Sequence, residues 1–212
     1  MIEMAFVDEK IALLEREARR QEKEAEEQKV QEEAQDLTQY LTLEEMLAAV
    51  REGSVTFPNQ EKFEFSVRTT LSEQIPMPFI KDIYTGVEED ENMTMLLDHD
   101  HDISQIITLT DHSIVEDSIG KWKKQLEGAM RELNAYAEVT EEKVMENLDY
   151  LIARTPSAKG WVHNICFRLR LGSGRVAGNY NCYEKDKKTY GIMLEALVLR
   201  LNEIIVDQGA VS

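Results

Sequence analysis

The chain of 212 residues contains few cysteines, little positive charge and no long apolar run. Its two cysteines, Cys166 and Cys182, are too few for a disulfide-stabilised scaffold. No stretch approaches the roughly 20 apolar residues that a membrane-spanning helix requires. Residues 1–10 contain neither a basic segment nor a long apolar run, so no secretory signal is visible. These absences make a cytoplasmic location the default expectation.

The 24 lysine and arginine residues are outnumbered by 41 aspartate and glutamate residues, which gives a formal net charge of −17. Phosphate binding requires a basic surface, so this balance argues against a nucleic-acid partner. It also argues against binding to an anionic membrane surface. An acidic surface favours solubility and attracts basic proteins, so we expect the partner to be another protein.

Common catalytic motifs are missing as well. No serine lies in a Gly-x-Ser-x-Gly sequence. The sequence Gly172-Ser173-Gly174 joins two expected strands and is not followed by the lysine of a phosphate-binding loop. No pair of catalytic carboxylates stands out among so many acidic residues. We therefore expect no enzymatic activity and no cofactor.

One segment does carry the chemistry of metal ligands. Its residues are Asp98, His99, Asp100, His101 and Asp102. On a strand, the His-x-His spacing would place both imidazoles on one face, where Zn²⁺ or Ni²⁺ could bind. A calcium-binding loop fits less well, because Ile103 and Leu109 stand where glycine and glutamate are required. Without a distant further ligand, we interpret the segment as a polar hairpin turn and expect no metal.

The clearest folding signal lies between Trp161 and Val206. Two stretches alternate apolar and polar residues on either side of Gly172-Ser173-Gly174, which predicts an antiparallel hairpin with one buried face. The apolar sets align when Leu171 is paired with Val176, Leu169 with Gly178, Phe167 with Tyr180 and Ile165 with Cys182, with Ser173-Gly174 as the loop. Cys182 then faces the core and Cys166 the opposite side, so two free thiols are expected. Apolar residues at helical spacing from Tyr190 to Ile205 predict a final amphipathic helix.

The polar side of this hairpin supplies a candidate binding surface. Arg168 and Arg170 share the face of Cys166, and Arg175 follows on the next strand. Together these three arginines predict an exposed cationic strip on an otherwise acidic protein. We therefore count Arg168, Arg170 and Arg175 as candidate partner-binding residues.

The remaining strands and helices follow from the same patterns. Alternation or proline content predicts strands within 54–71 and at 75–79, 93–98, 103–110, 140–146 and 150–154. Residues 86–92 are expected to form an acidic loop. A capping-box sequence at Ser113–Glu116 predicts a long helix with an apolar face from Val115 to Leu133. These elements predict an α+β fold in which one antiparallel sheet is packed by two long helices.

The N-terminal part has a different composition. Residues 8–36 are rich in charge and lack glycine and proline, and Ile11, Leu14 and Ala18 form a short apolar stripe. They predict a charged helix that is either a solvated helix or an arm that binds a partner or forms a homodimer. Thr42 to Gly53 predicts a short capped helix. We place the domain boundary there, with the helical arm and short helix in 1–53 and an α+β sandwich domain in 54–212.

The order of elements in residues 54–206 resembles the Mog1/PsbP/DcrB-like fold. Similar features are the Phe-rich early strand, the proline-rich segment Ile75–Phe79, the hairpin turn at Asp98 before a long helix, and the closing segment Arg175–Cys182 before a charged break and a terminal helix. Asn147-Leu148-Asp149 stands where that family often has an Asn-Gly turn. The resemblance implies a non-enzymatic protein-binding module, with DcrB-like adaptors of bacterial secretion systems as the nearest analogy.

Three functions are therefore open at this point. The first is a cytoplasmic adaptor or chaperone, for example for a secretion-system effector. The second is a metal-dependent module that uses the segment 98–102. The third is an immunity-like or antitoxin-like protein whose acidic charge masks a basic partner.

Overall fold

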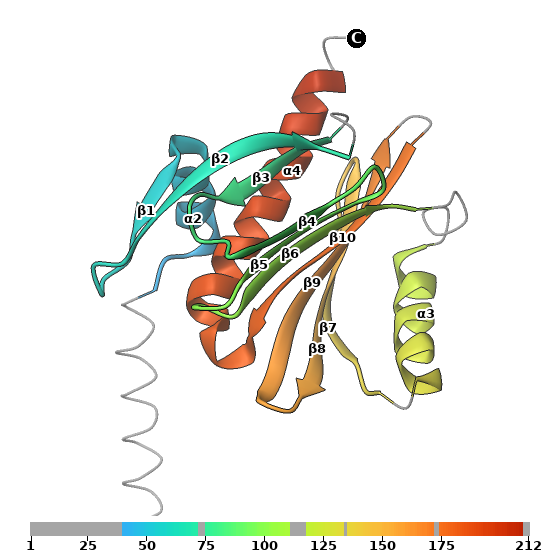
Figure 1. The fold of residues 1–212 in the computed structure, drawn as a ribbon. Coiled ribbons are helices and arrows are strands. Elements are labelled where there is room, and N and C mark those ends of the chain that lie inside the picture. Colours follow the sequence, from blue (N-terminus) through green and yellow to red (C-terminus); the bar gives the residue numbers. More distant parts are fainter. Residues whose placement is uncertain (1–39, 72–74, 111–117, 134, 172–173, 210–212) are drawn as a thin grey trace, which may run out of the picture. The chain divides into compact units, whose positions relative to one another are not determined.

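The computed structural model describes residues 40–71, 75–110, 118–133, 135–171 and 174–209. Its helices are α2 (Leu43–Glu52), α3 (Ile119–Glu132) and α4 (Ile192–Gly209), and α4 follows a 3₁₀ turn (Glu184–Asp186) and a π-helical turn (Lys187–Gly191). Its strands are β1 (Ser54–Thr56), β2 (Lys62–Thr70), β3 (Ile75–Ile80), β4 (Gly86–Glu89), β5 (Met93–Asp98), β6 (Ile103–Leu109), β7 (Glu138–Val144), β8 (Leu148–Ser157), β9 (Gly160–Leu171) and β10 (Gly174–Tyr183). These elements confirm an α+β fold with a large antiparallel sheet (Figure 1).

The strands form two sheets, so the prediction of a single sheet is wrong. A small sheet has the order β1-β2-β3, and a large sheet has the order β4-β5-β6-β10-β9-β8-β7. Strand β3 pairs with β2 alone, and it contains Pro76 and Pro78. Proline cannot donate a backbone hydrogen bond, so a strand with two prolines suits the edge of a sheet. The chain therefore begins a second sheet after β3.

The expected acidic loop at 86–92 also needs correction, because its first part is strand β4. Val87 lies opposite Leu96 of β5, and Glu88 lies opposite Met95. Strand β4 is an edge of the large sheet, and 55% of the Val87 surface is exposed. Charged residues on an edge strand hinder pairing with other chains. The acidic composition therefore reflects the position of the strand rather than the absence of one.

The two faces of the large sheet are covered differently (Figure 1). The main core lies on the face that α4 and the small sheet cover, and its largest buried side chains include Phe167, Tyr180 and Ile107. Gln105 ties the two sheets together, because its Nε2 donates a hydrogen bond to the carbonyl oxygen of Pro78 at 3.2 Å. On the opposite face, α3 packs over β7 and β8 and forms a smaller cluster around Leu151.

The register of the β9–β10 hairpin differs from the predicted one by two residues. Leu171 pairs with Gly174, and Phe167 pairs with Gly178 rather than with Tyr180. The residues between the two strands, 172–173, lie outside the described part. A shift of two residues keeps every side chain on its predicted face, because side chains alternate with a period of two. Cys182 therefore does face the core.

The prediction of two free thiols is confirmed for both cysteines. Cys182 is buried on the core side, and Cys166 lies on the opposite face beneath α3. Burial raises the pKa of both thiols to about 12. A thiol with such a pKa is almost wholly protonated near neutral pH, so neither cysteine has the character of a nucleophile.

Helix α3 begins later than predicted. Its N-cap is Ser118, whose Oγ accepts a hydrogen bond from the backbone N–H of Lys121 at 3.4 Å. The predicted start at Ser113 and the predicted apolar residue Val115 lie outside the described residues. Leu133, predicted on the buried face, follows the last helical residue and is 75% exposed. The apolar spacing therefore predicted one helical residue too many at the C-terminal end of α3.

Helix α2 forms as its sequence predicts. Thr42 and Glu45 complete a capping box, and Gly53 ends the helix with a φ of 93°. Met46 and Val50 are buried in the main core, and the helix packs against α4. Residues 41–212 form one compact unit, and α2 belongs to it. The predicted arm with Ile11, Leu14 and Ala18 lies outside the described residues.

Candidate functional site

Arg168, predicted on an exposed cationic strip, is only 1% exposed. Its guanidinium forms an ion pair with Asp149, with an Nη2–Oδ2 distance of 2.9 Å, and its Cζ lies 4.8 Å from the centre of the Trp122 ring. Helix α3 supplies Trp122 and covers this part of the sheet. The side chains of Arg170 and Arg175 lie outside the described residues. Arg168 therefore stabilises the packing of α3 and is not part of a free surface.

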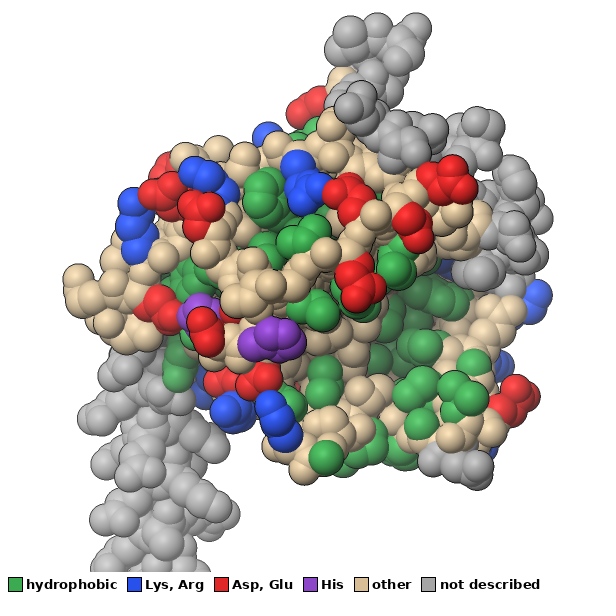
Figure 2. Space-filling view, viewed as in Figure 1, with side chains coloured by type: hydrophobic (Ala, Val, Ile, Leu, Met, Phe, Trp, Pro, Cys, Tyr) green, Lys and Arg blue, Asp and Glu red, His purple; other side chains and the backbone are tan. Residues whose placement is uncertain are grey.

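Beyond α3 the same side of the sheet is less covered. We use the term open face for the side of β5, β6 and β10 that is turned away from α4. Four of its larger apolar side chains, Met93, Met95, Leu97 and Ile106, are partly exposed. Figure 2 shows hydrophobic side chains gathered between the strands and α3. The open face thus offers apolar surface beside a helix.

Acidic residues border the open face at the β4 edge. Glu88 lies directly opposite Met95 on the neighbouring strand. Asp90 and Glu91 follow in the turn to β5, and all three acidic residues are exposed. Apolar side chains therefore adjoin a concentrated negative charge, which is a surface of mixed chemistry.

The segment 98–102 forms the turn of the β5–β6 hairpin, and its residues do not converge. The buried carboxylate of Asp98 accepts hydrogen bonds from the backbone N–H groups of Asp100 and His101, both at 3.1 Å, and it also contacts His101 Nδ1. His99 is exposed and points away from this cluster into a separate cleft. Among the described residues, no three His, Cys, Asp or Glu side chains are placed to hold a metal ion.

His101 instead joins three distant segments. Its Nε2 lies 2.9 Å from Glu61 Oε1, and Tyr190 donates a hydrogen bond to Glu61 Oε2 at 3.2 Å. The rings of Phe63 and Tyr190 pack edge-on against the imidazole, each at 5.5 Å between centres. Partial burial lowers the pKa of His101, but its bonds to Asp98 and Glu61 outweigh burial and raise the pKa overall. Both ring nitrogens are occupied, so this histidine acts as a structural clamp.

A cleft of about 370 Å³ with several charged residues in its lining lies between β7–β8 and the π-helical turn. Tyr150 donates a hydrogen bond to Glu195 Oε1 at 2.7 Å, and burial raises the pKa of Glu195. Burial lowers the pKa of His163, which lies 3.5 Å from Glu184. Lys187 pairs with Glu184 at 2.5 Å, so the charges of this cleft are engaged with one another. We find no reactive group here that awaits a substrate.

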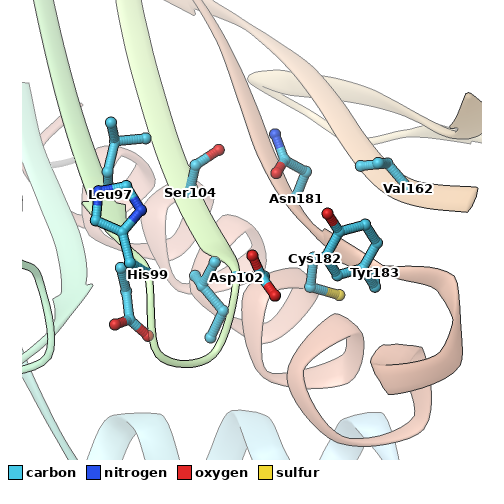
Figure 3. Close-up of a pocket in the computed structure, with 10 residues that line it drawn as sticks. Leu97, His99, Asp102, Ser104, Val162, Asn181, Cys182 and Tyr183 are labelled. Carbon is cyan, nitrogen blue, oxygen red and sulfur yellow. The ribbon is translucent and has the colours of Figure 1, made fainter. Parts of the chain in front are cut away.

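A second cleft of about 260 Å³ opens beside the turn at 98–102 (Figure 3). Its polar lining comes from His99, Asp102, Ser104 and Asn181, and Tyr183 forms part of its wall. His99 and Asp102 belong to the segment that the sequence singled out, but no sequence signal marks Ser104 and Asn181, because β6 and β10 become neighbours only in the folded sheet.

No family model matches the chain, and comparison with curated proteins found no similar sequence. Within the described part, none of the helices is long and apolar enough to cross a lipid bilayer. Any statement about function must therefore rest on the surfaces described above.

Proposed function

We propose that this protein is a non-enzymatic adaptor or chaperone that binds a basic, amphipathic segment of another protein on its open face. The observation that supports this proposal is the partly exposed row of methionine, leucine and isoleucine side chains beside an acidic strand edge. The apolar side of the partner segment packs on the open face, and its basic side lies toward Glu88, Asp90 and Glu91.

The apolar half of the surface suits protein binding. Contiguous apolar surface on a folded protein commonly marks an interaction site. Methionine is unbranched and polarisable, so Met93 and Met95 can adapt to partners of differing shape. Leu97 continues this row along β5, and Ile106 lies opposite Met95 on β6. A helix with one apolar face would cover these side chains in the way that amphipathic helices occupy hydrophobic grooves.

The charged half selects the partner. A net charge of −17 attracts basic proteins over long distances, and the acidic β4 edge directs them to the open face. The same charges disfavour the addition of a strand at β4. We therefore expect a partner to bind across the open face rather than to add a strand to the sheet at β4.

The proposal agrees with a Mog1/PsbP/DcrB-like assignment of the fold, whose members bind partners across the sheet or in a groove beside it. It places the protein in the cytoplasm, and it leaves Ile11, Leu14 and Ala18 of the charged arm as a second contact or a homodimer contact. A secretion-system effector is one candidate partner. The acidic β4 edge equally favours an immunity-like protein that masks a basic toxin, and toxicity of the partner would distinguish the two.

The test uses a labelled synthetic amphipathic helix of about 15 residues, built from leucine, alanine and lysine, and a counterpart with glutamate in place of lysine. We expect saturable binding of the basic peptide in fluorescence anisotropy, weakened by added salt, and little binding of the acidic one. Met95→Lys should weaken binding at least tenfold and Glu88→Lys severalfold. Glu52→Lys makes the same charge change as Glu88→Lys, at an exposed position of α2, and should have little effect on binding.

Two results would contradict this proposal. One is equal binding of the acidic and basic peptides. The other is unchanged affinity in both Met95→Lys and Glu88→Lys while circular dichroism shows that the variants are folded. Equal weakening by Glu52→Lys would show that general charge, and not the open face, accounts for the binding.

A further inference from the structure

The cleft beside the turn at 98–102 arises where two strands separate. Strands β6 and β10 pair from Leu109 and Val176 to Ser104 and Asn181, where their ladder ends. Strand β10 continues to Tyr183, but there it pairs only with β9. The chain leading into β6 turns away at Asp102, whose φ is 52°. The gap between the diverging strands is the cleft of about 260 Å³.

Ser104 lies in this cleft with its hydroxyl group unused. The residue is 8% exposed, and its hydroxyl has no hydrogen-bond partner within the described part of the chain. Its Oγ atom is not among the fully buried unpartnered atoms, so the hydroxyl reaches the solvent in the cleft. Figure 3 shows the Ser104 side chain among the residues that line the cleft. The group is thus available to a molecule that enters.

Two further side chains in the cleft have no partner among the described residues, Asn181 and His99. A carboxamide and a serine hydroxyl can each both donate and accept hydrogen bonds. The hydroxyl groups of a ligand can also do both, so they can pair with Ser104 and Asn181 in either role. Tyr183 and Val162 supply apolar surface for the C–H groups of such a ligand.

The charge of the protein and the volume of the cleft limit the choice of ligand further. The Asp102 carboxylate lies at the cleft 3.4 Å from Lys159 Nζ, whereas the carboxylate of Asp98 is buried against His101. The net charge of −17 on the whole protein disfavours an anionic ligand. The volume of about 260 Å³ equals roughly nine water molecules at about 30 Å³ each, which suits a ligand the size of one sugar ring.

We propose that this cleft binds a neutral, polyhydroxylated small molecule of the monosaccharide class, with Ser104 and Asn181 as its main hydrogen-bonding partners. The cleft adjoins the open face and shares Leu97 with it, but its tests use Ser104 and Asn181, whereas the tests of the peptide-binding function use Met95 and Glu88. The two proposals can therefore fail independently.

The test titrates the full chain with D-glucose, D-galactose and D-mannose in turn, and follows binding by saturation-transfer NMR. We expect saturable binding of at least one hexose, and about tenfold weaker binding in Ser104→Ala and in Asn181→Ala. Ser66→Ala changes a strand serine of the small sheet and should bind as the unaltered protein does. Ser104→Ala removes an unpartnered hydroxyl, so its melting temperature should not fall.

Charge is tested with glucose 6-phosphate, which should bind more weakly than glucose. Absence of saturable binding for all three hexoses would overturn the site. Equal binding by Ser104→Ala and Asn181→Ala would overturn the assignment of these two residues, and tighter binding of the phosphate ester would overturn the argument from charge.

Discussion

Gly178 on β10 lies directly beneath the ring of Phe167, and this contact gives a sharp test of the hairpin register. A Cβ atom at Gly178 would lie 2.5 Å from Cε1 and 2.7 Å from Cε2 of Phe167, and closer still to Cζ. The ring cannot easily move aside, because Phe167 is 0% exposed and packs edge-on against Tyr180 at 5.0 Å. The substitution Gly178→Ala should therefore be strongly unfavourable.

The magnitude follows from two opposing effects. Overpacking a closed core costs about 1–3 kcal/mol, and the upper end applies where the ring has no free space. Alanine in place of a strand glycine regains about 0.5–1 kcal/mol of backbone entropy. We expect Gly178→Ala to lower the free energy of unfolding by about 2 kcal/mol. Phe167→Leu in the same chain should restore part of this loss, because the smaller side chain leaves room for the methyl group.

The measurement is urea denaturation followed by circular dichroism for both single variants and the double variant. Gly128→Ala is the matched control, because a Cβ at this helix position meets nothing within 4 Å and should stabilise the protein by about 1 kcal/mol. If Gly178→Ala were as stable as Gly128→Ala, Phe167 would not lie over Gly178. The pairing of Gly178 with Leu169 would then have to be reconsidered.

Two further predictions concern charged groups. Arg168→Met would remove the ion pair between Arg168 and the buried carboxylate of Asp149, and we expect it to lower the free energy of unfolding by about 3–5 kcal/mol in urea denaturation. Arg131→Met, at an exposed position of α3, should lower it by under about 0.5 kcal/mol. The pKa of His101 is raised above its unfolded value of about 6.5, so its charge stabilises the fold fully below that pH and less as the pH rises through the folded pKa. The stability difference between the protein and His101→Gln should therefore be largest near about pH 6 and shrink in alkaline buffer; a difference that grows with pH would contradict the role given to Asp98 and Glu61.

The sequence signals that predicted well are local ones. The capping box at Thr42 and the ending at Gly53 depend on residues a few positions apart, and both are present in α2. Alternation predicted most strands for the same reason, since it reports one buried and one exposed face. Strand β4 was not predicted, because its glutamates are exposed on an edge strand, where no alternation with buried residues is required.

Features that depend on distant pairing could not be predicted. The hairpin register was wrong by two residues because alternation is unchanged by such a shift, and only the contact of Phe167 with Gly178 distinguishes the two pairings. Burial of Arg168 depends on where α3 packs. The structural clamp at His101 needs Glu61 and Tyr190 from separate segments, and no spacing in the sequence links them.

The order of strands in the large sheet has a consequence for how the chain reaches its native state. Strands β4-β5-β6 and β7-β8-β9-β10 are two local meanders, and in the described sheet they are joined by the pairing of β6 with β10. That pairing joins residues distant in sequence, so forming it carries a large loss of chain entropy and should limit the folding rate. During synthesis the core side of β9 and β10, which packs on α4, stays uncovered until α4 has been made. Until then the nascent chain exposes apolar surface that is prone to aggregation, and we expect a chaperone to bind it at this stage.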